Sequence, residues 1–211
     1  MKRIPFFILS VFALLLSVPQ MVSGNRELTS PTALPSSLET TFAGGNSQSG
    51  NYFQVDVAAT NGIDVTSMTG NFADVLSLGA GTVEVWVRDG VIGTVPGSTG
   101  WTQVATATIT VPAGTSWLAP SQQTFATNFS LAAGSHTFLF SYSENVAYTD
   151  GTAVGAVAAQ DSNLTIYEGY GTADLQPDGT SAYAFFPRVW NGSFEYDVTS
   201  TTTPTTGQLQ K

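Results

Sequence analysis

The sequence predicts an all-β protein, an antiparallel two-sheet β-sandwich of jelly-roll-like type with an N-terminal signal peptide. Three observations support this prediction. The 211 residues include 21 glycines and 10 prolines but only 10% charged side chains, a composition typical of short strands joined by turns. Apolar and polar residues alternate along several segments, as they do in half-buried strands. Beyond the leader, no stretch of about 12 residues shows the apolar spacing of a helix.

The N-terminus has the pattern of a secretory leader. Lys2 and Arg3 precede an almost wholly apolar run from Ile4 to Val18, and small residues follow up to Gly24. This pattern predicts a signal peptide over residues 1–24, cleaved after Gly24. The alternative is an uncleaved membrane anchor, but the apolar run of about 15 residues is shorter than the roughly 20 of a spanning helix. We therefore expect a secreted, extracellular protein with no membrane insertion after signal cleavage.

The rest of the chain divides into three parts by composition. Residues 25–37 contain turn formers and two prolines without periodicity, and are predicted to be a flexible lead-in. Residues 199–211 are rich in threonine and low in complexity, which predicts a disordered tail. Between them, residues 38–198 are predicted to form one β-sandwich domain.

The strands of this domain are predicted from alternation. It is clear at residues 52–59, 82–89, 104–111 and 137–143, and weaker at 63–72, 123–131, 153–159 and 163–168. In the second segment three valines point one way, while Glu84, Trp86 and Arg88 point the other. We expect the valine side in the core and the mixed side outward. Two sheets packed face to face bury such strands economically.

The last two strands are predicted to form a hairpin. Asn191-Gly192 is a strong signal for a two-residue turn. Such a turn would place Arg188 opposite Glu195, where a structural cross-strand ion pair is a better interpretation than a ligand clamp. The same register would point Trp190 outward.

Several sequence motifs resemble those of an uncharacterised β-sandwich module of exported bacterial proteins. The resemblance depends on TFAGGN at 41–46, TVEVW at 82–86, TDGTAVGAV at 149–157, NLTIYEG at 163–169 and FPRVWNGSFEY at 186–196. It covers nearly the whole predicted domain. It implies an extracellular accessory domain, and it carries over no catalytic residue.

The sequence offers few groups for catalysis. There is no cysteine, and His136, the one histidine, begins a predicted strand as an exposed or edge residue. A Ser-His-Asp triad and a transition-metal site are therefore not expected. The acidic residues lack a motif that would mark a glycosidase pair. We expect no enzyme activity.

The charged residues also limit the partners. A net charge of −9 argues against nucleic acid, whose phosphates need basic patches. No cofactor is predicted. A structural calcium ion held by Asp150 with Asp161, or by Asp174 with Asp178, is an alternative without motif support, because neither pair has the spacing of a calcium loop. Ordinary Asx turns also account for these residues.

The tryptophans are the candidate ligand-binding residues: Trp86, Trp190, Trp101 and Trp117. The apolar face of a sugar ring stacks on indole, while its hydroxyl groups bind neighbouring polar side chains. The leading hypothesis is therefore a non-catalytic module that binds carbohydrate, such as a polysaccharide, or another cell-surface ligand. The alternative is a structural or assembly subunit of an extracellular matrix or filament, for which exposed sheet edges are suited.

Overall fold

A computed structural model describes residues 35–76, 79–93, 97–177 and 185–200. The predicted leader, most of the predicted lead-in and residues 201–211 of the predicted tail lie outside these ranges. The described residues form antiparallel strands only, so they contain no helix that could span a membrane. The fold is the predicted antiparallel β-sandwich.

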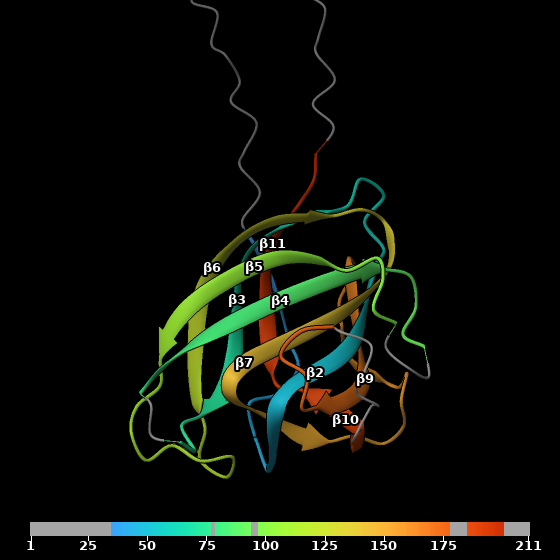
Figure 1. Cartoon of the computed structure of the whole chain (residues 1–211). Coiled ribbons are helices and arrows are strands. Elements are labelled where there is room, and N and C mark those ends of the chain that lie inside the picture. Colours follow the sequence, from blue (N-terminus) through green and yellow to red (C-terminus); the bar gives the residue numbers. More distant parts are fainter. Residues whose placement is uncertain (1–34, 77–78, 94–96, 178–184, 201–211) are drawn as a thin grey trace, which may run out of the picture. The chain divides into compact units, whose positions relative to one another are not determined.

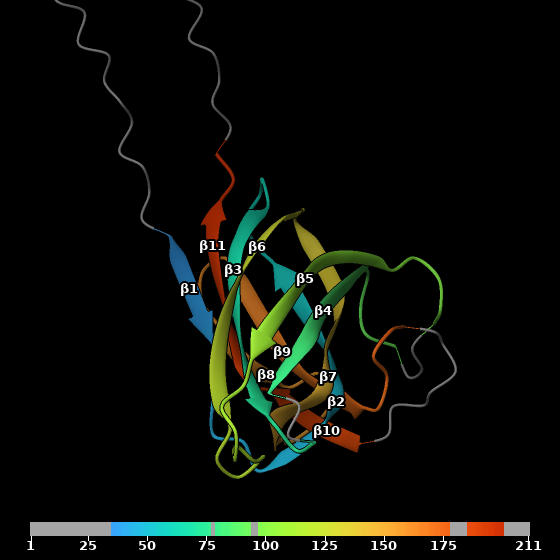
Figure 2. The ribbon, with the colours of Figure 1, turned by 60° about the vertical axis from the view of Figure 1, so that its left-hand side comes forward.

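The described strands form two layers. Hydrogen-bond pairing defines the first layer, which contains β1 (Ser36–Glu39), β11 (Gly192–Val198), β3 (Ile63–Ala73) and β6 (Ser121–Leu131). The second contains β5 (Thr102–Thr110), β4 (Ala80–Asp89), the first half of β7 (Gly134–Asp150), β2 (Asn46–Val57), β9 (Leu164–Thr172) and β8 (Val157–Gln160). In Figure 2, β1, β11 and β3 lie on one side and β4, β7 and β2 on the other.

The long strand β7 joins the two layers. Its first half pairs with β4 and β2. Its last residues stay paired with the start of β2 and also pair with β3 and with β10 (Phe185–Trp190). Figure 1 shows β4, β5 and β7 crossing in front of β3 and β11. The inner faces of both layers supply the core, as the alternation predicted for β2, β4 and β5.

Strand β7 departs from simple alternation, because both of its faces are largely buried. Phe138 and Phe140 face the core between the layers, but Leu139 on the opposite face is equally inaccessible. Side chains and a loop cover that outer face, which therefore belongs to a second apolar cluster. In a strand that is buried on both faces, apolar residues occupy both faces. Alternation then does not show which face points to the core.

The predicted last hairpin is wrong. Strand β10 pairs with β7 and β9, while β11 pairs with β1 and β3, so Asn191-Gly192 connects the two strands without pairing them. Arg188 forms an ion pair with Asp150 at 3.0 Å instead of with Glu195. Glu195 instead accepts a hydrogen bond from the Ser37 hydroxyl. Burial of Trp190, the residue before the turn, in the core between the layers favours this arrangement over the hairpin.

Two predicted boundaries also change. Strand β1 begins at Ser36, inside the segment predicted as a flexible lead-in. The strand predicted at 153–159 is confined to Val157–Gln160. The residues before it form a turn, because the buried carboxylate of Glu168 accepts hydrogen bonds from the backbone N–H groups of Thr152 and Ala153.

Candidate functional site

The outer face of the second layer carries a row of large side chains at one level of the sheet. Trp86 on β4 lies opposite Leu139 on β7, Leu139 opposite Tyr52 on β2, and Tyr52 opposite Tyr170 on β9. We call these four residues the outer row. Because cross-strand neighbours on one face lie within contact distance, four strands contribute to one platform.

Trp101, which precedes β5, covers part of this row. Its ring centroid lies 5.7 Å from that of Tyr52, and its indole N–H donates to the Gly97 carbonyl at 2.6 Å. The guanidinium of Arg88 lies over the indole, 5.0 Å from the ring centroid. Trp101 is therefore held between a cation and an aromatic ring, and it shields Tyr52 from solvent.

Trp86 is hydrogen-bonded to Glu84, which lines a small hollow. The half-buried indole donates its N–H to Oε2 of Glu84 at 3.0 Å, which fixes both side chains. Glu84 in turn lines a hollow of about 100 Å³ together with Leu175, Gln176 and the hydroxyl-bearing residues Thr82, Ser141 and Ser143. Glu84 thus links the indole to a concave surface that offers hydroxyl, amide and carboxylate groups beside the apolar side chain of Leu175.

The segment that follows β9 supplies the other wall of this hollow. Oδ2 of Asp174 accepts a hydrogen bond from the Tyr52 hydroxyl at 3.1 Å, and the Leu175 carbonyl accepts one from the Ser141 hydroxyl at 2.7 Å. These two bonds hold the segment against β2 and β7. The hollow is therefore built from the sheet on one side and from a fixed loop on the other.

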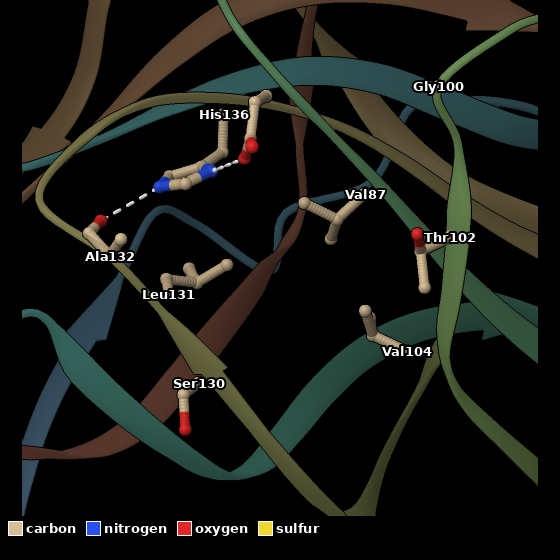
Figure 3. A pocket seen from close by; sticks show the side chains of 9 residues that line it. Val87, Gly100, Thr102, Val104, Ser130, Leu131, Ala132 and His136 are labelled. Carbon is tan, nitrogen blue, oxygen red and sulfur yellow. Dashed lines mark hydrogen bonds and ion pairs between the residues drawn. The ribbon is translucent and has the colours of Figure 1, made fainter.

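A larger hollow of about 330 Å³ lies where β5 and β6 approach each other (Figure 3). His136 lines it together with Asp89, Thr102, Ser130 and apolar side chains. Nε2 of His136 donates to the Ala132 carbonyl at 2.9 Å, and Nδ1 lies 2.9 Å from Oδ1 of the exposed Asp89. Both ring nitrogens therefore already have partners.

The prediction of an exposed or edge His136 is wrong, because the ring is buried. The nitrogen that would accept a proton from a nucleophile is donating to a carbonyl, and the Ser130 hydroxyl donates to Asp64.

Asp56 lies near the His136 ring. Burial raises the pKa of Asp56, but hydrogen bonds from Ser135, Gln54 and Tyr167 together with the charge of His136 outweigh burial and lower it.

The four tryptophans that were predicted to bind a ligand lie in three different places. Trp86 and Trp101 lie on the outer face. Trp117 is 42% exposed and belongs to the loop between β5 and β6, where its carbonyl accepts the Gly45 N–H at 2.7 Å. Trp190 is only 1% exposed and stacks on Phe53 in the core, so its predicted outward position is wrong.

The acidic pairs considered for calcium are engaged with other groups. Asp150 pairs with Arg188, and Asp161 accepts the N–H of Leu164 and the hydroxyl of Tyr196. Asp174 is bound to Tyr52, and Asp178 lies outside the described residues. Within the described ranges, no group of three or more histidine or acidic side chains is arranged to hold a metal ion.

Alternation alone did not identify the residues that line the hollow together with Glu84. Gln176 and Leu175 follow the last residue of β9 in a segment without periodicity. Ser143 lies on β7, whose two faces are both largely buried. One sequence signal for the outer face was available. Tyr52 directly precedes the core residue Phe53 in a strand, so its side chain points to the opposite, outer face.

Comparison with known proteins adds no family. No family model matches the chain, and neither does any curated protein. Among solved structures, the cysteine protease and lectin-like domains of Cwp84, a surface layer associated protein of Clostridium difficile, align with a TM-score of 0.44 and 13% identity. The alignment covers 78% of this chain and 36% of that one. A clostridial Cwp84 cysteine protease after propeptide cleavage aligns with a TM-score of 0.43 and 13% identity, over 78% and 40% of the two chains.

Proposed function

We propose that this protein is a non-catalytic extracellular module that binds a neutral carbohydrate on the outer face of its second layer. One observation carries the proposal. The half-buried indole of Trp86 is fixed by Glu84, and Glu84 itself lines a hollow to which hydroxyl-bearing residues and the amide of Gln176 also contribute. The extracellular location rests on the leader pattern of residues 1–24 and on the resemblance to modules of exported proteins.

The chemistry of this surface suits a sugar. The indole offers an apolar face to the C–H groups of a sugar ring. Glu84 accepts hydrogen bonds, the amide of Gln176 both donates and accepts, and Ser143 keeps its O–H for donation because its oxygen already accepts the Thr82 N–H at 2.9 Å. The net charge of −9 disfavours sulfated and uronic polymers, so a neutral glycan is the better ligand.

Binding of the purified protein to an array of neutral polysaccharides, followed by calorimetry on the positives, tests the proposal. Trp86→Ala is expected to weaken binding roughly tenfold, equivalent to about 1.4 kcal/mol. Gln176→Ala and Ser143→Ala are expected to weaken it without altering the packing of the indole. Trp117→Ala is the matched control, because it removes an exposed indole from a different loop.

Two results would contradict the proposal. One is an array without any binding. The other is a ligand whose affinity depends on Thr102 and Ser130 but not on Trp86, which would move the site to the hollow beside His136. Urea denaturation of each variant separates lost binding from lost folding.

Exposed apolar side chains favour a second candidate function, assembly into an extracellular structure. Val157 on strand β8 and Leu118 in the loop before β6 are both exposed. Within the described residues β8 pairs with β9 alone, so it presents an edge that another chain can extend. Sedimentation over a wide concentration range tests this candidate, and a strictly monomeric protein would argue against it.

A further inference from the structure

Two buried carboxylates lie side by side where β3 ends against β7. The register places Phe72 opposite Val146 and Ala73 opposite Asn145. Its continuation brings Asp74 beside Glu144. Their side chains are 5% and 2% exposed, respectively. They lie at one end of the interlayer core, on the same side of their strands as the buried Phe72 and Val146.

Each carboxylate has one oxygen with a hydrogen-bond donor and one without. The Leu76 N–H donates to Oε2 of Glu144 at 3.1 Å, and the Gly79 N–H to Oδ1 of Asp74 at 3.4 Å. Oδ2 of Asp74 and Oε1 of Glu144 are buried without a hydrogen-bond partner in the described part of the chain. Neither ion pair formed by the described residues includes these two acids.

A third polar group completes the cluster. Tyr142 precedes Glu144 by two residues on the same face of β7, and its ring contacts Phe72 edge-on at 5.0 Å. The side chain is fully buried, and its hydroxyl has no partner among the described residues. The hydroxyl therefore belongs to a side chain on the same face of β7 as Glu144.

Burying two like charges with open oxygens is unfavourable unless a counter-charge is present. Carboxylate and hydroxyl oxygens are ligands of hard divalent cations, which complete their shells with water. We propose that Asp74 and Glu144 bind one divalent hard cation, Ca²⁺ or Mg²⁺, through Oδ2 and Oε1, with the Tyr142 hydroxyl facing its coordination shell. The ion would tie the end of β3 to the middle of β7. This site is separate from the outer face and does not depend on carbohydrate binding.

The purified full chain, stripped with EDTA and dialysed, is the material for the test. Calorimetric titration with CaCl₂ and separately with MgCl₂ is expected to show one ion bound per chain for at least one cation. The melting temperature is expected to rise by roughly 5–10 °C when that cation is present at about one hundred times its Kd. The cation that both binds and raises the melting temperature is the ion that this site holds.

Asp74→Asn and Glu144→Gln keep the shape of each side chain and remove its charge. Both variants are expected to lose at least tenfold in cation affinity and most of the melting shift. In EDTA they are expected to be as stable as the wild type or more so, because the repulsion is gone. Asp197→Asn and Glu39→Gln, on β11 and β1, are the matched controls and are expected to respond like the wild type.

Two outcomes would overturn the proposal. One is a stripped wild-type protein that binds neither cation and melts at the same temperature in EDTA, CaCl₂ and MgCl₂. The other is a cation response that survives in both Asp74→Asn and Glu144→Gln, which would place the ion elsewhere.

Discussion

Trp190→Ala is expected to destabilise the fold far more than Trp86→Ala. The Trp190 indole is 1% exposed, stacks on Phe53 with centroids 4.6 Å apart, and packs against Phe140 and Phe194 at 5.4 and 5.3 Å. Removing such a ring leaves a cavity between the layers that the rigid neighbouring rings cannot fill. Buried tryptophan-to-alanine changes cost about 3–5 kcal/mol. For a chain of this size, that cost lowers the melting temperature by roughly 6–20 °C.

Two further variants make this prediction specific to packing. Trp190→Phe retains an aromatic ring and removes an indole N–H that has no partner in the described structure, so it is expected to cost less than the alanine variant. Trp86→Ala removes a half-buried ring and is expected to cost about 1–2 kcal/mol. Urea denaturation followed by far-ultraviolet circular dichroism is the suitable assay, because removing an indole alters the fluorescence. The reasoning is refuted if Trp190→Ala costs less than about 1 kcal/mol, or no more than Trp86→Ala.

Three other predictions concern hydrogen bonds and charges. Glu168→Gln is expected to lower the free energy of unfolding by about 1–3 kcal/mol in urea denaturation. The buried carboxylate accepts two hydrogen bonds from Thr152 alone, and an amide cannot replace it. An unchanged free energy of unfolding would contradict this prediction. Burial and a hydrogen bond to Asp161 raise the pKa of Tyr196 to about 12, so its stabilising contribution is complete below pH 10 and is lost as the pH rises through 12. Tyr196→Phe is expected to make denaturation midpoints fall less steeply over that range, and an unchanged slope would argue otherwise. Asp150→Asn breaks an ion pair whose carboxylate is largely exposed, so a thermal scan is expected to show a change of less than about 1 kcal/mol.

The strands could be predicted because their signal is local. The valines of β4 alternate with Glu84, Trp86 and Arg88, and a strand with one covered face and one half-exposed face needs no more than that pattern. The weaker segments at 63–72, 123–131 and 163–168 also correspond to strands, β3, β6 and β9. Strand β1 was missed, because four residues with one buried side chain leave too short a pattern.

The pairing of the strands could not be predicted in the same way. Asn191-Gly192 favours a hairpin, but β10 and β11 bond to different strands. A turn signal is worth a small local preference, whereas burying Trp190 between the layers contributes several kcal/mol. The candidate site has the same origin. The half-exposed position of Trp86 was predictable, but only the fold brings Gln176 to the hollow that Glu84 lines.

The sequence by itself determined the class of fold and the sidedness of its clearest strands, because alternation follows from the geometry of an extended chain. The tertiary structure decided which tryptophan is in the core, which partners Arg188 and Glu195 take, and that Asp74 lies beside Glu144. These outcomes depend on contacts between segments far apart in the chain, whose energies come from shared burial. No local pattern contains that information.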